Sequence, residues 1–340
     1  MATIKAIVPV VLVLLFGGTA PPDSDEGNRG SEPQNSYYAA VFLNRGHVSG
    51  GGVSNLGLFR RGPGDTAWSN IYRRNLFTFG LGLWKSGSTT RQYIAAGNGL
   101  HRSDDGRKTW RVLTDWRTEE VLSVALDPVD SAVIYIGTPF GMFRSTDDGA
   151  RWQKKMSGMN SWFVRKVIID WSDRSTLFAG AEDDLYRTTD KGEHWAPLHV
   201  GVPGMEVVVQ HPADPKHLLV GTSDDGVRVS VDGGKSWKEG KGLPNTAFYA
   251  VCVSSDKQTI YAGGYQTGLW TSSDRGFSWS LLWQDPEIEA VYAIFVHPDD
   301  PRHIMVGTSG QGIYESRDGG KIWSNIGLKG CHVKQIELYP

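Results

Sequence analysis

Cysteine, net charge and long helix-forming stretches are all scarce in this chain of 340 residues. Two cysteines, Cys252 and Cys331, cannot supply a disulfide framework, and a chain of this length builds a sufficient core without one. We expect Cys252 to be a small buried hydrophobe. The formal net charge of -2 gives no basis for expecting nucleic acid or an anionic membrane surface as a partner.

The sequence also lacks the common cofactor motifs. No set of His and Cys has metal-ligand spacing, and neither a glycine-rich phosphate loop nor a nucleophile elbow occurs. We therefore expect no cofactor and no metal. What the chain has in excess is glycine and tryptophan, with 42 and 13 copies. Because glycine permits tight turns and aromatic residues suit pleated surfaces, this composition favours short strands joined by turns.

The first 35 residues differ from the rest. Residues 1–20 carry Lys5, an apolar stretch over residues 7–16 and small residues at 17–20, a pattern typical of a secretory signal peptide. Pro21 disfavours cleavage directly after Ala20, so the alternatives are a shifted cleavage site and an uncleaved N-terminal anchor. Residues 21–35 are polar, without apolar periodicity, and predict a flexible leader. We expect an exported, periplasmic or extracellular protein with one domain over residues 36–340.

An eight-residue pattern, Ser/Thr-x-Asp-x-Gly-x-x-Trp, recurs along that domain. Five copies fit it, and a sixth is placed with one extra residue before Trp110. A seventh copy has lost the Asp and Gly but keeps Trp68 in register. The tryptophans that end the copies lie roughly 42 residues apart. Six copies keep the aspartate. In chain order these residues are Asp104, Asp147, Asp190, Asp232, Asp274 and Asp318.

Each repeat also contains three apolar stretches before the motif, and the tryptophan opens a fourth. Four short strands in such a unit are typical of one propeller blade, so the sequence predicts an all-β, seven-bladed β-propeller. The first unit lacks its first strand, whereas residues 331–340 match a first strand and follow the last unit. We therefore expect the C-terminal segment to pair into the first blade and close the ring.

The repeated aspartates have a structural rationale. An Asp side chain can accept backbone N–H bonds within the turn, and the glycine can adopt a positive φ. The tryptophan can pack its ring between the hairpin and the core. Because an active site needs one constellation rather than seven, we interpret these aspartates as structural.

The motif and its flanking phrases resemble the Asp-box (bacterial neuraminidase repeat) propellers over residues 37–340. That superfamily implies the fold but not one function, since it includes sialidases, xyloglucan-cleaving glucanases, sortilin-type receptors and photosystem II assembly factors. The sialidases' Arg-Ile-Pro phrase is missing here, as are the second propeller of the xyloglucanases and the cysteine-rich module of sortilins. The assembly factors match in size, in having one propeller and in being exported.

Candidate ligand contacts lie in the loops that lead from one blade to the next, on the face opposite the Asp-boxes. Aligning the inner strands puts residues of different chemistry at one equivalent position, namely Leu122, Arg165, Glu206, Tyr249, Tyr292 and Lys334. Such variety suits a binding funnel, but a hydrated channel mouth with paired charges, such as Arg165 with Glu206, remains an alternative. Trp116, Arg117 and Trp162 are candidates for stacking on a sugar or anchoring a protein, or for rim packing.

Three functions remain open from the sequence. The first hypothesis is a non-catalytic exported propeller that binds a protein or a carbohydrate, without nucleic acid, as a monomer. The second is a divergent glycoside hydrolase with a carboxylate pair among Glu206, Glu289 and Asp285, which could equally be a solvated rim. The third is an assembly factor for a membrane complex, with direct membrane contact only through an uncleaved N-terminal segment. We favour the non-enzymatic hypotheses.

Overall fold

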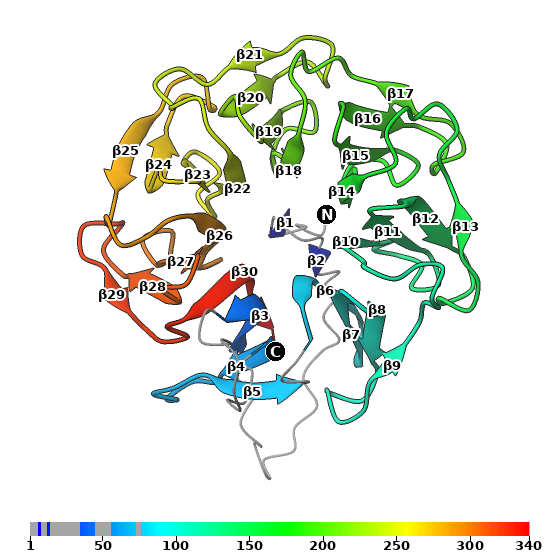
Figure 1. Ribbon diagram of the computed structural model, residues 1–340, viewed down its shortest axis with the longest axis horizontal. Helices are drawn as coiled ribbons and strands as arrows, with labels where there is room; N and C mark the ends of the chain where they lie inside the picture. The colour runs from blue at the N-terminus through cyan, green and yellow to red at the C-terminus, as the bar shows by residue number, and fades with distance from the viewer. Residues whose placement is uncertain (1–5, 8–11, 14–34, 45–55, 73–75, 340) are drawn as a thin grey trace, which may run out of the picture.

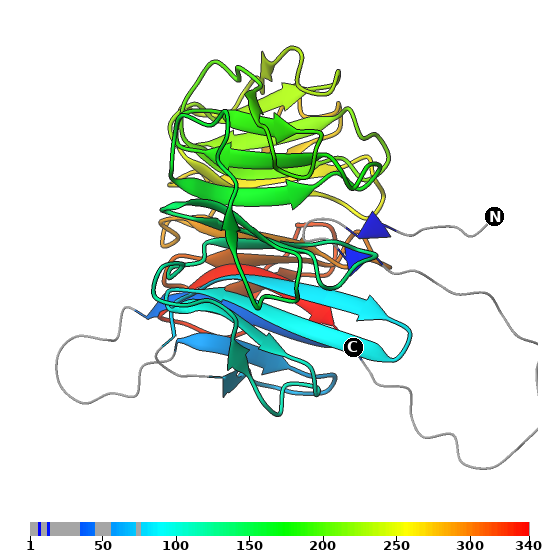
Figure 2. The ribbon, with the colours of Figure 1, turned by 90° about the vertical axis from the view of Figure 1, so that its right-hand side faces the viewer.

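The computed structural model describes residues 6–7, 12–13, 35–44, 56–72 and 76–339. Within these ranges the chain contains strands and no α-helix. Seven four-stranded antiparallel sheets are arranged as blades around a common centre (Figure 1). Seen edge-on, the ring is a thick disc (Figure 2). The predicted all-β, seven-bladed propeller is confirmed.

The strands of each blade follow one order, from the centre outward. Blade 1 consists of β30 (Cys331–Tyr339), β3 (Ser36–Asn44), β4 (Gly57–Arg61) and β5 (Ser69–Tyr72); blade 2 of β6 (Thr78–Ser86), β7 (Thr89–Ala96), β8 (Gly99–Ser103) and β9 (Arg111–Val112); blade 3 of β10 (Ser123–Leu126), β11 (Ile134–Thr138), β12 (Gly141–Ser145) and β13 (Gln153–Lys154). Blade 4 consists of β14 (Val164–Ile169), β15 (Leu177–Ala181), β16 (Leu185–Thr188) and β17 (Ala196–Pro197); blade 5 of β18 (Met205–Gln210), β19 (Leu218–Thr222), β20 (Val227–Ser230) and β21 (Lys238–Glu239). Blade 6 consists of β22 (Phe248–Val253), β23 (Ile260–Gly264), β24 (Leu269–Ser272) and β25 (Ser280–Trp283); blade 7 of β26 (Val291–Val296), β27 (Ile304–Thr308), β28 (Ile313–Ser316) and β29 (Ser324–Asn325).

The two ends of the propeller meet in blade 1. Strand β30 is the inner strand of that blade and pairs antiparallel with β3, with Ala39 opposite Ile336 (Figure 1). It also contacts β26 of blade 7 and β6 of blade 2, so the inner strands form an unbroken ring. The expected closure by the C-terminal segment is confirmed.

Hydrophobic cores lie between successive blades rather than within them. Each buried cluster draws side chains from two neighbours, as where Phe59 of blade 1 packs with Met305 of blade 7 and Val333 of the closing strand. Several motif tryptophans add a hydrogen bond across this boundary. The Nε1–H of Trp152 donates to the Leu113 carbonyl of the preceding blade at 2.9 Å. Because a single blade cannot bury its own apolar faces, the ring is stable only when neighbouring blades pack together.

The Asp-box turns follow one hydrogen-bond scheme. In the box of blade 3, the Ser145 hydroxyl donates to Asp147 at 2.9 Å, and the same carboxylate accepts the Arg151 backbone N–H at 2.8 Å. Gly149 closes the turn with a φ of 85°. The equivalent aspartates accept the corresponding two bonds in the other four regular boxes, at Asp190, Asp232, Asp274 and Asp318.

The assignment of Asp104 to the box of blade 2 is wrong. There the Ser103 hydroxyl donates to Asp105, and Asp105 accepts the Thr109 backbone N–H. The box therefore begins at Ser103 and needs no extra residue before Trp110. Arg107 occupies the glycine position with a φ of 76°, and this substitution hid the correct register in the sequence.

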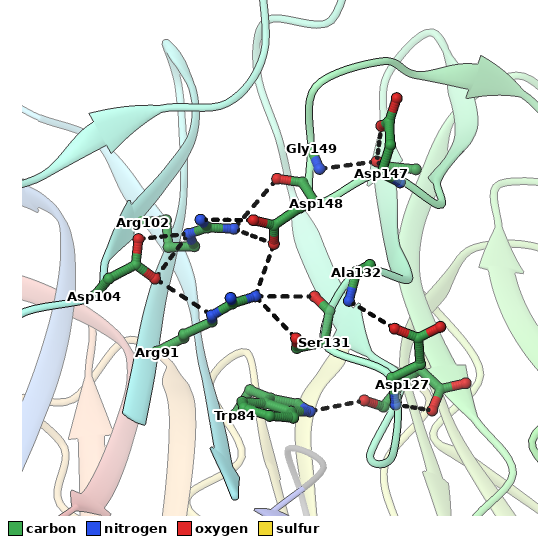
Figure 3. Close-up of polar contacts among 12 residues, drawn as sticks. Trp84, Arg91, Arg102, Asp104, Asp127, Ser131, Ala132, Asp147, Asp148 and Gly149 are labelled. Atoms are coloured by element: carbon green, nitrogen blue, oxygen red, sulfur yellow. Dashed lines mark hydrogen bonds and ion pairs between the residues drawn. The ribbon is translucent and has the colours of Figure 1, made fainter. Parts of the chain in front are cut away.

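Asp104 belongs instead to a charged cluster between blades 2 and 3 (Figure 3). Arg102 of β8, which is 2% exposed, bonds both carboxylate oxygens of Asp148 in the next blade's box, one of them at 3.0 Å. Arg91 of β7 donates to the same carboxylate at 2.7 Å. Asp104 pairs with Arg102 and, at 3.4 Å, with the exposed Arg111. This cluster ties the two blades together on the Asp-box face.

Both cysteines are buried and free, in strands β22 and β30, so no bridge joins them. Of residues 1–20, the structure describes β1 (Ala6–Ile7) and β2 (Leu12–Val13), which pair antiparallel with each other. The remaining positions of the predicted signal peptide or anchor, and residues 21–34 of the predicted leader, lie outside the described residues. Within the described part of the chain, no helix has the length and apolar character needed to cross a membrane.

Candidate functional site

A β-bulge recurs at the same position of the inner strands. In β14, Val164 pairs with Ala181 and Lys166 with Gly180, so Arg165 between them has no partner in the ladder. A bulge leaves one residue unpaired and turns its side chain away from the sheet. The residues left unpaired in this way are Phe79, Arg165, Glu206, Tyr249, Tyr292 and Lys334, which we call the bulge positions.

The bulge positions surround a cavity of about 400 Å³ at the centre of the ring. All six line it, together with Leu122 at the equivalent point of blade 3. Phe42 and Phe163 add aromatic surface, and Glu120 adds a carboxylate at the rim. The residues that the sequence aligned at one position, from six different blades, thus do converge on one space.

Arg165 and Glu206 form an ion pair on the wall of the cavity. The Arg165 Nε lies 3.3 Å from the Glu206 Oε2. The other carboxylate oxygen of Glu206 accepts the Ser223 hydroxyl at 2.8 Å. Glu206 therefore has both oxygens engaged, and the pairing that we considered as the alternative to a binding funnel does exist.

Lys334 lies among aromatic rings on the same wall. Its Nζ is 3.4 Å from the centroid of the Tyr292 ring, 5.6 Å from that of Phe42 and 5.9 Å from that of Tyr249. The Tyr249 and Tyr292 rings lie 4.9 Å apart. Burial lowers the pKa of the Lys334 ammonium to about 8; the nearby Glu206 opposes this shift and Arg165 adds to it. The faces of the rings stabilise the ammonium partly in place of water.

Deeper in the cavity, polar side chains form a floor. Gln335 donates from Nε2 to Glu337 at 2.8 Å and accepts the Leu81 backbone N–H of blade 2 at 2.8 Å. Burial raises the pKa of Glu337 to about 8, against the opposing effects of Gln335 and of Lys166. Burial also lowers the pKa of Lys166, with Glu337 opposing that shift. Both groups are therefore held closer to neutrality than they would be in water.

Other predicted contact residues lie on the face outside the cavity. Trp116 is 74% exposed and Trp162 64% exposed, in the loops that enter blades 3 and 4. The Arg117 guanidinium lies 5.1 Å from the Trp116 ring, and the Lys154 ammonium lies 3.8 Å from the Trp162 ring. Both tryptophans project from the loop-rich face rather than packing between blades.

The proposed carboxylate pair does not gather in one place. Glu206 lines the cavity, whereas Asp285 and Glu289 are not among its lining residues. Asp285 accepts the Glu287 backbone N–H at 2.9 Å within its own loop. Among the described residues, no group of three or more His, Cys, Asp and Glu is placed to hold a metal ion.

Sequence reasoning missed part of the cavity. Phe79 occupies the bulge position of blade 2, but its strand runs on to Ser86 without the proline that ends most inner strands. Lys166, Gln335 and Glu337 follow bulge positions on β14 and β30 by one to three residues. Charged or amide side chains are unusual in an inner strand. Their presence in these strands could have indicated that they line the cavity.

Replacing Lys334 by methionine tests its environment through the pH dependence of stability. Because the pKa is about 8 in the folded chain against an ordinary 10.5, the unfolded chain binds this proton more tightly. Below pH 8 the charged lysine therefore lowers the free energy of unfolding by about 3 kcal/mol, and this cost disappears as the pH rises through 10.5. The stability of the wild type relative to Lys334→Met should rise over that interval in urea titrations. The exposed Lys235→Met is the control, and a difference between wild type and Lys334→Met that stays constant with pH would contradict this account.

Comparisons with known proteins agree with this architecture. Residues 141–268 match the family model described as "Sortilin, neurotensin receptor 3". A comparison with curated proteins finds no match. Among solved structures, the GH74 xyloglucanase from Xanthomonas campestris has a TM-score of 0.59 at 22% identity, covering 73% of this chain and 45% of the enzyme. An extracellular domain from B. thetaiotaomicron gives 0.59 at 14% identity, covering 74% of this chain and 33% of that one.

A third similar structure is that of YCF48 bound to D1 peptide, with a TM-score of 0.52 at 17% identity, covering 69% of this chain and 76% of that one. The chain spans less than half the length of the xyloglucanase and of the extracellular domain. The chain is thus a seven-bladed β-propeller with Asp-box turns that is similar in part to a sortilin family model, and the comparisons single out no particular protein. Its structural neighbours include an enzyme, an extracellular domain and a peptide-bound protein.

Proposed function

We propose that this chain is an exported, non-catalytic propeller that binds a protein or glycan on its loop-rich face, with the central cavity as the point of contact. One observation carries the proposal. Residues at a structurally equivalent position in successive blades differ in charge and aromatic character, yet all line one cavity. Packing alone would favour similar apolar residues at equivalent positions of a repeat, so this variety supports recognition of a ligand.

Exposed aromatic side chains extend the same face. Among the described residues, five of the six exposed aromatic side chains lie in loops on this side of the disc: Phe77, Trp116, Phe140, Trp162 and Tyr265. The sixth, Trp171, follows the inner strand of blade 4 at its opposite end. Tryptophan and tyrosine dominate protein-binding hot spots and also stack on sugar rings. Their concentration on one face supports a binding surface there.

The placement of the three candidate catalytic carboxylates, Glu206, Asp285 and Glu289, argues against hydrolysis. A glycosidase needs two carboxyl groups across a cleft, one of them free to attack or to transfer a proton. Glu206 is held by Arg165 and Ser223, and the other two candidates do not line the cavity. The similar xyloglucanase is also more than twice as long as the segment that aligns with it. We therefore favour binding without turnover.

Truncating the two exposed tryptophans should weaken ligand binding. We expect Trp116→Ala and Trp162→Ala each to reduce affinity by roughly five- to thirtyfold, because a tryptophan at an interface is worth about 1–2 kcal/mol. Binding is measured on a glycan array and by quantitative capture of secreted and envelope proteins. Ile322→Ala is the matched control, since Ile322 is also 74% exposed but lies in the Asp-box of blade 7 on the opposite face.

Turnover is tested in the same preparation. Purified protein is incubated with polysaccharides and sialosides, and released sugars are followed by mass spectrometry. Release of a defined sugar that is lost in Glu206→Gln would replace the binding function by hydrolysis. Equal ligand capture by wild type, Trp116→Ala and Trp162→Ala would move the binding surface away from the loop-rich face.

A further inference from the structure

We propose that Lys334 is the anchor for a single carboxylate on a ligand whose adjoining part is apolar or flat. This inference rests on the proposed binding function and names the chemistry that the cavity recognises. Lys334 stands on the closing strand β30 and points its ammonium into the cavity.

The charges that line the cavity leave Lys334 without an acceptor. Arg165 is paired with Glu206. Glu337 at the floor accepts a hydrogen bond from Gln335 and is close enough to Lys166 for each to affect the pKa of the other. The remaining carboxylate, Glu120, is exposed at the rim. In the described part of the chain, Lys334 has ring faces around its ammonium but no ion-pair partner and no hydrogen-bond acceptor. Three N–H donors enclosed in this way favour an anion brought by a ligand.

The chemistry around Lys334 limits what that anion can be. One uncompensated positive charge matches a monoanion such as a carboxylate, whereas a phosphate brings nearly two negative charges. The Phe42, Tyr249 and Tyr292 rings flank the ammonium, so the atoms next to the carboxylate would pack against aromatic surface. A long polyanion is disfavoured, because the chain has a net charge of -2 and the rim carries carboxylates such as Glu120.

A cavity of about 400 Å³ admits a group of modest size. Two sources share the required chemistry: the C-terminal carboxylate of a peptide that ends in an apolar residue, and a small aromatic or aliphatic acid. A sugar acid has the same charge but a more polar body. The test therefore varies two properties of the ligand separately: the carboxylate charge, and the polarity of the part attached to it.

The experiment is calorimetric titration of the full chain at pH 7 with matched acid and amide probes. The probes are 3-phenylpropionate against 3-phenylpropionamide, a short peptide ending in phenylalanine with a free against an amidated C-terminus, and glucuronate. We expect the acids to bind roughly ten- to hundredfold more tightly than the amides, the range for a hydrogen bond to a charged group. Glucuronate should bind more weakly than 3-phenylpropionate. If the peptide with a free C-terminus binds more tightly than 3-phenylpropionate, the ligand is a peptide C-terminus; the reverse order indicates a small acid.

Variants assign the effect to Lys334. Lys334→Met should remove the preference for acid over amide, Lys334→Arg should restore most of it, and Lys235→Met on the opposite face should leave it unchanged. At pH 8.5, binding should take up a proton, measured from the dependence of the heat on the buffer. The groups facing Lys334 are Arg165, Glu206, Tyr249 and Tyr292. Because Glu337 titrates in the same range, Glu337→Gln must retain this uptake.

Equal binding of acid and amide, an unchanged preference in Lys334→Met, or no binding of any acid at millimolar concentration would overturn the carboxylate anchor. Those results leave the binding function standing if Trp116→Ala and Trp162→Ala still lose their ligand. Glycoside turnover overturns the binding function whatever the calorimetry gives. The two proposals therefore fail in different measurements.

Discussion

Removal of residues 331–340 is expected to abolish folding of the propeller. The segment supplies the inner strand of blade 1, and Cys331, Val333, Ile336 and Tyr339 are buried within it. Four such side chains at about 2 kcal/mol each amount to some 8 kcal/mol, comparable with the whole stability of a typical domain. The deletion also leaves β3 with an open edge, which invites pairing with another chain. We therefore expect insoluble or molten protein, measured by sedimentation and by near-ultraviolet circular dichroism.

The matched control removes the other end of the chain. We propose that residues 36–340 form the complete folding unit, so deletion of residues 1–35 should leave the thermal midpoint within a few degrees of that of the full chain. Adding a synthetic peptide of residues 331–340 to the C-terminal deletion should restore part of the folded signal. A soluble deletion variant with native near-ultraviolet signal would show that the closing strand is dispensable.

The fold could be predicted from the sequence because the same pattern of strands and turn occurs in every repeat. Tryptophans at regular spacing and a motif with a turn-forming Asp and Gly predict one blade, and repetition then predicts the ring. The closing strand could be predicted by counting strands, since the first unit lacked one strand and residues 331–340 supplied one after the last unit. Asp104 shows the limit of this approach. Arg107 stands where glycine belongs, so matching by the glycine shifted the register by one residue.

The site was only partly predictable, for a different reason. Equivalent positions in a repeat share their backbone environment, so Arg165, Glu206 and Lys334 could be brought together from alignment alone. Their partners could not be, because side-chain contacts across the ring depend on blade packing. Lys166 of blade 4 and Glu337 of blade 1 shift each other's pKa across the centre, and nothing in either local sequence indicates this. The same holds for the Tyr292 ring under Lys334.

Asp148→Asn is expected to lower the free energy of unfolding by about 3 kcal/mol, because it removes the carboxylate charge that binds the buried Arg102 guanidinium and leaves only the partly exposed Asp104 to balance it. Arg102 is 2% exposed and binds both oxygens of Asp148, which also accepts Arg91 (Figure 3). Asparagine keeps the volume of the side chain and tolerates the φ of 67° at this position, so the loss reports the charge rather than the backbone. Urea unfolding followed by tryptophan fluorescence measures the change.

A second substitution distinguishes the contribution of the Arg102–Asp148 ion pair from that of the Asp-box turn. Lys191 occupies the same position in the next Asp-box with a φ of 62°, and its side chain is exposed. Lys191→Asn should therefore change stability by no more than about 0.5 kcal/mol. The double variant Arg102→Met with Asp148→Asn no longer buries the Arg102 charge. It should therefore recover part of the free energy of unfolding that Asp148→Asn loses. If the two substitutions were simply additive, Asp148 would act on the turn alone, and the tie between blades 2 and 3 would rest on apolar packing and the remaining arginine contacts.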